Sequence, residues 1–371
     1  MPRNIYFFAS FGNLKGQPTG GGTTAARRLR AMLEKFGYNV VITNRHKFKN
    51  EAGLKSKVRK YFWLCADPVI FFFQLLFRKR KDSTVLFMTY AGSLLPFDYL
   101  ISLAATLTGH RLLMYLAGGK AYKSYYEGGS FYKWLFRATV RQYDEIMTEG
   151  AINVKLIKDA GNGKVRAYHL PNFTEDGFAP AELPKKDGDK VNIMFFGRIA
   201  PEKNITLILD IFEELQRKYP FANLLLVGSG PKDYEAKVKS RIESSPSRES
   251  IEWKAWADHA TLKGLMSGQH IYLFPSAEPC EGHSNALNEA MSWGLVPVVS
   301  SNNFLPAIVG IPELVADGYN KELYISIISK LIDEDRIEEY SNLVYNRVKD
   351  NFTQSVVERK LEKELSAYWN L

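Results

Sequence analysis

The chain has 371 residues, of which 46% are hydrophobic and 24% charged, as in an ordinary globular protein. The length suits two domains, and two cysteines, Cys65 and Cys280, are too few for a disulfide scaffold or a four-cysteine zinc site and fit a reducing cytoplasm. The net charge is +9, but segment 45–81 holds eleven lysines and arginines against two acids, so the excess forms one local patch and argues against a surface that coats nucleic acid.

A strand-like segment starts at Ile5, and it is not preceded by a charged stretch followed by a long apolar stretch. We therefore expect no signal peptide. It lacks an uninterrupted apolar run of about 18 residues, so no spanning helix is expected. In the first half, β-branched and aromatic runs alternate with helical patterns, which predicts a doubly wound parallel sheet. Strands are expected at 5–9, 39–43, 84–89, 111–116, 145–148 and 165–170, and helices at 23–35, 97–107, 130–142 and 152–159.

A glycine-rich segment, 16–24, lies between the first strand and the first helix and includes Gly20, Gly21 and Gly22. Consecutive glycines let the backbone approach a ligand, and the helix that follows offers free N–H groups at its positive end. The segment therefore indicates either a contact with a phosphate or charged sugar donor, or a surface loop.

The basic segment 45–81 contains two helical patterns, 54–65 and 68–77, and we expect Asp67 and Pro68 to cap and open the second. Aromatic-rich apolar faces bordered by lysine and arginine are typical of helices that lie in a membrane interface. We expect this patch to dock the protein on an anionic membrane; the alternative is two helices packed on the sheet with solvated lysines. The basic residues assigned to the membrane are Lys55, Lys57, Arg59, Lys60, Arg78, Lys79, Arg80 and Lys81.

Segment 174–190 holds two prolines and no periodicity, and the alternation of strands and helices restarts after it. Strands are expected at 191–196, 223–227, 251–254, 271–274 and 296–300, and helices at 204–218, 234–244, 260–266, 285–293, 321–333, 337–349 and 354–369. These patterns predict an α/β protein of two doubly wound, Rossmann-like domains with a ligand in the cleft between them. The expected boundaries are 1–173 for the first domain, 174–190 for the linker, 191–352 for the second domain and 353–371 for a helix that packs back on the first domain.

Two segments of the second half carry chemistry. After the first strand, Arg198 and Lys203 flank an expected helix start at Pro201, an arrangement that either clamps a diphosphate without a metal or leaves two solvated charges. After the fourth strand, Glu281 lies in a loop and Glu289 lies about one turn into a helix capped by Ser284 or Asn285. Carboxylates on both sides of a helix N-terminus suit a nucleotide-sugar, with hydroxyls at each end and phosphate between them. The alternative is acids at a helix start that complement the helix dipole.

The pattern Gly-Arg-x4-Lys, then 227–231 (Val-Gly-Ser-Gly-Pro), then Pro-Ser…Glu-x7-Glu-Ala-Met resembles the retaining GT-B glycosyltransferases of family 4, the glycosyl transferases group 1. The resemblance is dense over 191–301 and thinner in the first half, where it includes the glycine loop and 169–172. It implies a GT-B architecture and a glycosyltransferase that uses a nucleotide-diphospho-sugar, without a metal or other cofactor.

By this resemblance, Arg198 and Lys203 bind the donor diphosphate, Glu289 binds the ribose hydroxyls and Glu281 contacts the transferred sugar. Further donor contacts are implied for Gly21, Gly22, Gly197, Trp256, Ala257, His283, Ser284, Asn285, Ala286 and Leu287. For His283, a core or surface role remains an alternative. The sequence departs from the family in two places: the strand that ends at Leu116 is followed by no histidine, and Glu278, Pro279 and Cys280 lengthen the glutamate loop.

We therefore expect a glycosyltransferase on the cytoplasmic face of the membrane, which extends a lipid-linked or surface-polysaccharide acceptor. The alternatives are a sugar-nucleotide epimerase or hydrolase on the same fold, and a non-catalytic, membrane-associated sugar-nucleotide-binding subunit. No metal is expected: the histidines lack metal-ligand spacing, and the acidic run 333–335 is placed at a helix end.

Overall fold

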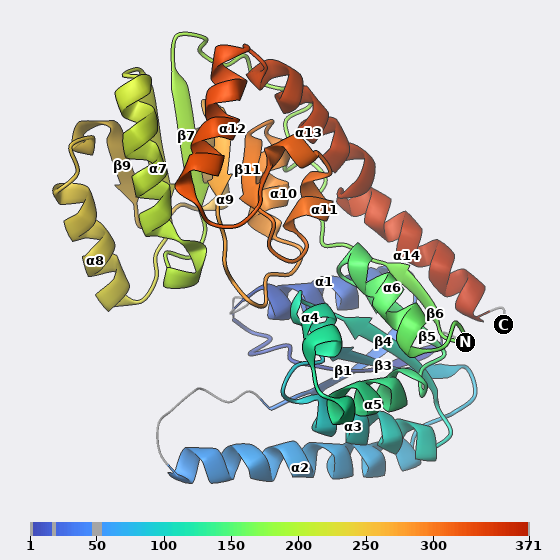
Figure 1. The fold of residues 1–371 in the computed structure, drawn as a ribbon. Helices are drawn as coiled ribbons and strands as arrows, with labels where there is room; N and C mark the ends of the chain where they lie inside the picture. Colours follow the sequence, from blue (N-terminus) through green and yellow to red (C-terminus); the bar gives the residue numbers. More distant parts are fainter. Residues whose placement is uncertain (1–2, 17–19, 47–53, 370–371) are drawn as a thin grey trace. The chain divides into compact units, whose positions relative to one another are not determined.

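A computed structural model describes residues 3–16, 20–46 and 54–369. The chain divides into two compact units, one of Met1–Pro171 with Glu358–Leu371 and the other of Asn172–Val357 (Figure 1). Each unit is built on a parallel sheet with helices on both faces, which confirms the predicted α/β class. Parts of two segments discussed above, 17–19 of the glycine loop and 47–53 of the basic patch, lie outside the described residues.

Over the described residues, the sheet of the first unit has six strands in the order β2-β1-β3-β4-β5-β6. Their bounds are β1 Asn4–Ala9, β2 Asn39–Asn44, β3 Ser83–Thr89, β4 Arg111–Leu116, β5 Glu145–Thr148 and β6 Arg166–His169. All neighbouring pairs are parallel, so the carboxyl ends of the strands meet at one edge. The predicted strands therefore agree with the structure to within about a residue at most ends.

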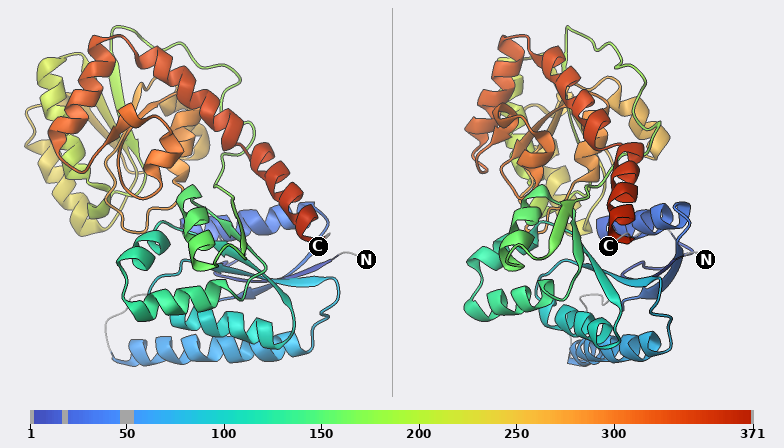
Figure 2. Two further views of the ribbon diagram at one scale, coloured as in Figure 1. Left: turned by 45° about the vertical axis from the view of Figure 1, so that its right-hand side comes forward. Right: turned by 90° about the vertical axis from the view of Figure 1, so that its right-hand side faces the viewer.

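The helices of the first unit cover both faces of its sheet (Figures 1 and 2). Their bounds are α1 Gly21–Lys35, α2 Leu54–Leu76, α3 Leu95–Leu107, α4 Lys120–Glu127, α5 Ser130–Val140, α6 Ala151–Ala160 and α14 Gln354–Trp369. Apolar side chains of α2, α3, α5 and α6 form one core with Tyr6, Phe8 and Phe87 of the sheet. On the other face, the hydroxyl of Tyr368 in α14 lies 2.9 Å from that of Thr84.

Helix α2 corrects the prediction of two helices, because it is continuous through Pro68. Asp67 does not cap a helix: its carboxylate binds the imidazole Nδ1 of His46, at 2.6 Å, at the end of β2. This partner from another element cannot be read from the local sequence. Cys65 is exposed on α2, and no helix within the described ranges has the length and apolar character needed to cross a bilayer.

The sheet of the second unit has six described parallel strands in the order β12-β11-β10-β7-β8-β9. Their bounds are β7 Val191–Phe196, β8 Ala222–Val227, β9 Ile251–Lys254, β10 Ile271–Phe274, β11 Val296–Ser300 and β12 Val315–Ala316. The α-helices around them are α7 Ile205–Lys218, α8 Lys232–Glu243, α9 His259–Met266, α10 Asn285–Ser292, α11 Leu305–Val309, α12 Lys321–Asp333 and α13 Ile337–Asn351. The elements α4, α11 and β12 were not predicted; α11 and β12, of five and two residues, are too brief to show a period in the sequence.

Candidate active site

The carboxyl ends of β7, β8, β9 and β10 meet at one edge of the second sheet, and the loops that follow them carry the predicted motifs. Gly228 lies so close to the loop after β7 that a Cβ atom there would overlap the carbonyl oxygen of Gly197. Its φ of 137° is also one that other residues rarely adopt. The glycines of 227–231 therefore let the loops after β7 and β8 pack backbone to backbone at this edge of the sheet.

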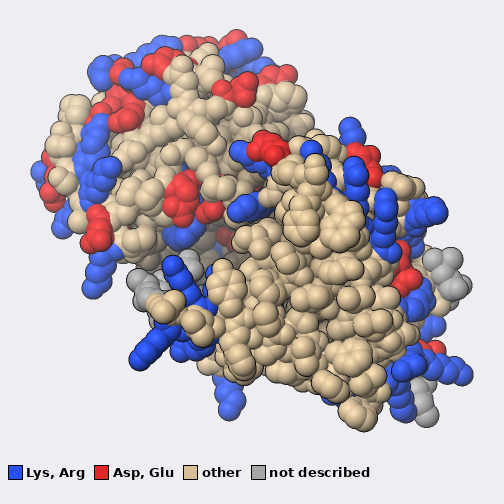
Figure 3. Space-filling view, turned by 60° about the horizontal axis from the view of Figure 1, so that its bottom comes forward, with Lys and Arg blue, Asp and Glu red and all other residues tan. Residues whose placement is uncertain are grey.

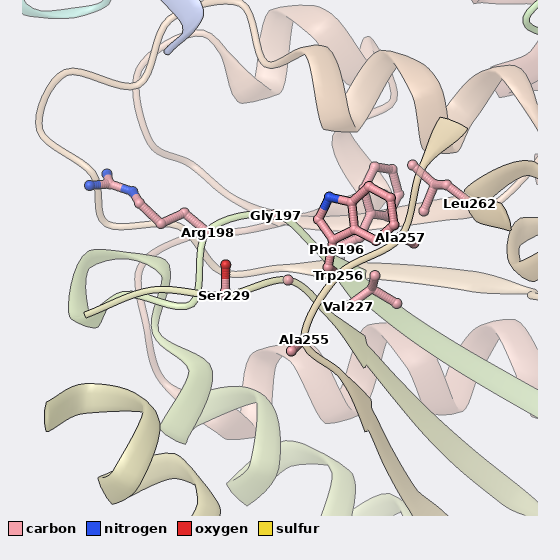
Figure 4. Close-up of a pocket in the computed structure, with 10 residues that line it drawn as sticks. Phe196, Gly197, Arg198, Val227, Ser229, Ala255, Trp256, Ala257 and Leu262 are labelled. Carbon is pink, nitrogen blue, oxygen red and sulfur yellow. The ribbon is translucent and has the colours of Figure 1, made fainter. Parts of the chain in front are cut away.

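A cavity of about 290 Å³ opens at this edge (Figure 4). Its walls come from the ends of β7, β8 and β9 and from α9: Phe196, Gly197, Arg198, Val227, Gly228, Ser229, Ala255, Trp256, Ala257 and Leu262. Trp256 is 74% exposed, so its indole offers a large uncovered surface to a planar group. In the view of Figure 4, the Arg198 side chain lies on one side of Ser229 and the indole on the other. The cavity thus combines an aromatic wall with a cation.

Arg198 is held by two carboxylates. Its guanidinium lies 2.7 Å from Glu202 and 2.9 Å from Glu278, and its side chain is 56% exposed. Glu278 belongs to the lengthened part of the loop after β10, and the side chain of Asn302 donates to its backbone carbonyl. The insertion therefore places a competing anion on a cation of the cavity wall, while Cys280 of the same loop is exposed.

Lys203 and Glu281 form a buried ion pair next to this wall; they are 9% and 8% exposed. Lys203 ends the short 3-10 turn Pro201–Lys203, so Pro201 opens this turn and the α-helix α7 starts two residues after Lys203. The hydroxyl of buried Ser276 donates to Glu281 and lies 3.4 Å from the Lys203 ammonium. Ser276 also accepts from the Glu278 N–H, at 3.3 Å, which links the Lys203 cluster to the partner of Arg198.

Helix α10 begins where the glutamate loop ends. Ser284 is its N-cap and accepts from the Leu287 N–H at 3.3 Å, which decides between the two predicted caps. Glu289 is half-buried within α10. Burial raises the pKa of the Tyr272 phenol well above its usual value, and the nearby carboxylates of Glu281 and Glu289 raise it further. The Tyr272 hydroxyl donates to the carbonyl of Phe196 at the end of β7.

His283 is 3% exposed, and its ring is bound within the second unit. Its Nε2 lies 3.1 Å from the amide oxygen of Asn288, and its ring packs edge-on against Phe352. Asn172 donates to the His283 carbonyl, and Asn288 donates to the Asn172 carbonyl. These contacts tie the start of the second unit to the glutamate loop, and they engage the histidine ring with partners inside that unit.

Gly21 and Gly22 open helix α1 in the first unit. A Cβ at Gly22 would overlap the phenol oxygen of Tyr90, whereas a Cβ at Gly21 would meet no atom within 4 Å. In the same unit, Lys123 and Glu127 of α4 form an exposed pair at 3.9 Å, and Lys120 opens that helix.

The sequence patterns missed two residues of this edge, Ser276 and Glu278. Ser276 stands within the quoted motif, but only its contacts with Lys203 and Glu281 reveal a role. Glu278 is part of an insertion in the sequence, and only its ion pair with Arg198 reveals a role. Asp333 of the acidic run accepts from the Lys218 ammonium and the Tyr219 hydroxyl at the end of α12, at 2.7 and 2.6 Å.

Residues 179–350 match the family of glycosyl transferases group 1. It is 24% identical over 159 residues to a component of the phosphatidylinositol N-acetylglucosaminyltransferase of Arabidopsis thaliana, and 30% identical over 148 residues to O-antigen chain mannosyltransferase B of Escherichia coli. These matches cover 43% and 38% of this chain but only 33% and 37% of the relatives, so the chain matches about a third of each curated relative.

Solved structures share the fold over the full chain. Sucrose-phosphate synthase from Thermosynechococcus elongatus superposes with a TM-score of 0.74 at 14% identity and covers 99% of both chains. Anabaena HepE, solved with UDP and glucose, superposes with a TM-score of 0.66 at 12% identity over 98% of this chain and 100% of that one. The predicted GT-B fold is confirmed.

Proposed function

We propose that the protein is a retaining, metal-independent glycosyltransferase that takes a nucleotide-diphospho-sugar. The observation that supports this most is the edge of the second sheet, where an aromatic-walled cavity with Arg198 adjoins the buried Lys203–Glu281 pair. Ligands of doubly wound sheets bind at such edges. The match to a glycosyltransferase family and the fold shared with a UDP complex of HepE support the same activity.

Each group then has a task in the reaction. Trp256 and Ala257 take the nucleobase, and Glu289 accepts hydrogen bonds from the ribose hydroxyls. Arg198 and Lys203 stabilise the charge that grows on the diphosphate as it leaves, a role in which preorganised cations contribute strongly. Glu281 faces the transferred sugar and stabilises its positive charge, and the amides of 284–287 contact phosphate or sugar at the start of α10. Gly21 and Gly22 of the first unit contact the donor through backbone.

The acceptor of the proposed reaction is lipid-linked or a surface polysaccharide, and the protein works at the cytoplasmic face of the membrane. Helix α2 supports this location, because Val58, Tyr61, Phe62, Val69 and Phe73 are exposed apolar side chains on it. Figure 3 shows a broad uncharged face on the first unit with blue lysine and arginine side chains gathered at its edges. Such a surface matches a helix that lies in the interface of an anionic membrane.

Incubation of the purified chain with UDP-, GDP- and ADP-sugars tests the activity. We expect one donor to raise the melting temperature and to be hydrolysed slowly or transferred, with turnover unchanged in EDTA. Arg198→Ala should lower turnover about 10²–10³-fold without unfolding the protein. Donor binding without hydrolysis or transfer to any acceptor would contradict the proposal and identify a protein that only binds sugar nucleotides.

A further inference from the structure

Helix α5 carries a groove on its outer side that no motif accounts for. The groove has a volume of about 290 Å³ and is lined by Ser130, Lys133, Trp134, Arg137, Ala138 and Arg141. The buried side chains of α5, Leu135, Phe136 and Val140, belong to the core of the first unit. Since Ser130, Trp134 and Ala138 recur every four residues on the opposite side of the helix, the groove faces away from the sheet.

Three cations lie along this groove at four-residue spacing: Lys133, Arg137 and Arg141. Among the residues that the structure describes, no carboxylate forms an ion pair with any of the three. One edge of the Arg137 guanidinium is fixed, because its Nε donates to the Tyr125 hydroxyl at 2.8 Å. Cations at this spacing repel one another in the absence of an anion, and the small side chain of Ala138 leaves room for one.

The groove is bordered by two exposed aromatic side chains. Phe131 and Trp134 are 69% and 58% exposed, and their rings stack at 5.9 Å. Tryptophan next to basic residues is typical of protein surfaces that contact lipid headgroups. There the indole ring lies at the edge of the acyl chains and the cations contact phosphate.

The position of α5 also supports contact with lipid headgroups. Helices α2, α3 and α5 pack side by side on one face of the first sheet, in all the views of Figures 1 and 2. The Tyr143 hydroxyl just after α5 lies 2.6 Å from that of Ser102 in α3. Leu100 and Leu107 of α3 are exposed between the two outer helices. The groove and the apolar side of α2 therefore belong to one face.

We propose that the α5 groove binds the phosphate headgroup of an anionic membrane lipid, as a second contact beside α2. This inference rests on the proposed membrane location and adds a defined site to it. Lys133, Arg137 and Arg141 contact the phosphate, and Phe131 and Trp134 enter the interface next to it. Two points of contact orient the first unit on the membrane, which a single helix cannot do.

Binding to vesicles of phosphatidylcholine with a rising fraction of phosphatidic acid tests the site, at constant salt. One basic side chain near an anionic surface contributes about fivefold in affinity, so Lys133→Gln with Arg141→Gln should weaken binding roughly 25-fold. The control is Lys237→Gln with Lys239→Gln on α8, an equal loss of charge in the other unit, and it should bind as the wild type does. Equal affinity of the two double variants would overturn the inference.

Brominated acyl chains provide a second readout, since they quench only tryptophans that enter the membrane. Trp134→Phe should remove a quenched component of the wild-type fluorescence. Inorganic phosphate at millimolar concentration should not release the protein from vesicles; release would assign the groove to free phosphate instead. If vesicle binding through α2 persists and the α5 variants change nothing, the groove site is wrong but the proposed membrane location stands. If the wild type does not bind vesicles at all, both the groove site and the proposed location are wrong.

Discussion

Lys203 and Glu281 lie 78 positions apart in the sequence, yet they form an ion pair from which water is nearly excluded. The pair joins the loop after β7 to the loop after β10, and the Ser276 hydroxyl satisfies a further bond of the carboxylate. Removal of one partner of a buried pair leaves the other charge without compensation, which costs more than the pair contributes. The cation that we assign to the leaving diphosphate therefore also holds the fold of the site.

This double role predicts that Lys203→Met destabilises the protein as well as inactivating it. We expect a loss of about 3 kcal/mol or more in the free energy of unfolding, because Glu281 would remain buried and charged. The double variant Lys203→Met with Glu281→Gln should regain most of that stability and none of the activity. Urea unfolding measures the first effect, and donor turnover measures the second. A single variant as stable as the wild type would show that the pair does not hold these loops together.

Glu278 should weaken donor binding, because its carboxylate forms an ion pair with Arg198 in the absence of a ligand. Glu278→Gln removes one negative charge that a diphosphate must displace, so we expect UDP or GDP to bind about threefold to fivefold more tightly, in keeping with an exposed ion pair. Calorimetry with the free nucleotide measures the change. Glu338→Gln on α13 is the matched control and should have no effect. Weaker binding by Glu278→Gln would mean that the glutamate positions Arg198 for the donor.

The two motif glutamates should differ in kinetics. Ribose contacts are equal in the ground and transition states, so Glu289→Gln should mainly raise KM. Charge on the sugar grows only during the reaction, so Glu281→Gln should mainly lower kcat. It should also lower the stability of the fold, because Lys203 loses its buried partner. Steady-state kinetics with the preferred donor separates these effects, and identical signatures in the two variants would contradict the division of roles.

Membrane binding through α2 should depend on salt only in part. The cationic attraction is screened over about 8 Å at physiological ionic strength, whereas burial of aromatic side chains is not screened. Cosedimentation with anionic vesicles should therefore fall, but not vanish, as salt rises. Changing Arg78, Lys79, Arg80 and Lys81, which follow α2, together to glutamine should remove roughly four charges' worth of the salt-dependent attraction and spare donor binding.

The control for this variant is the change of Lys232, Lys237, Lys239 and Arg248, all exposed in the second unit, to glutamine. If both fourfold variants bind vesicles equally, α2 is a helix packed on its sheet with solvated cations, the alternative considered from the sequence.

His270 should remain neutral in acid. Burial lowers the pKa of its imidazole to about 4, Lys186 nearby acts in the same direction, and its Nδ1 accepts from the Asn192 N–H at 3.1 Å. Because the folded pKa lies below the unfolded value of 6.5, this histidine stabilises the fold above pH 6.5 and progressively less as the pH falls towards 4.

This histidine contributes about 3 kcal/mol at most to the free energy of unfolding. Titration of the ring protons by NMR checks it, with the resonance assigned from His270→Asn. A midpoint near 6.5 for the His270 ring would contradict the burial.

The sequence predicted a feature correctly where the interactions that form the feature are between residues close together in the chain. Strand β7 is apolar except for Asn192 and was placed correctly, and Ser284 was among the two predicted caps because a capping residue bonds within its own turn. The prediction that Asp67 caps a second helix was wrong, because Asp67 binds His46 at the end of β2. The contact of Glu278 with Arg198 spans 80 positions, and no periodicity or spacing reports such a pairing.

The exposed thiols of Cys65 and Cys280 stand where two different events are proposed, one on α2 and one in the glutamate loop. The chain has no other cysteine, so replacing either by serine leaves a single attachment point for a spin label or an environment-sensitive dye. A probe on Cys65 would report contact with lipid, and a probe on Cys280 would report the arrival of nucleotide. Spectroscopy on these two single-cysteine proteins would then give the order in which membrane and donor are engaged.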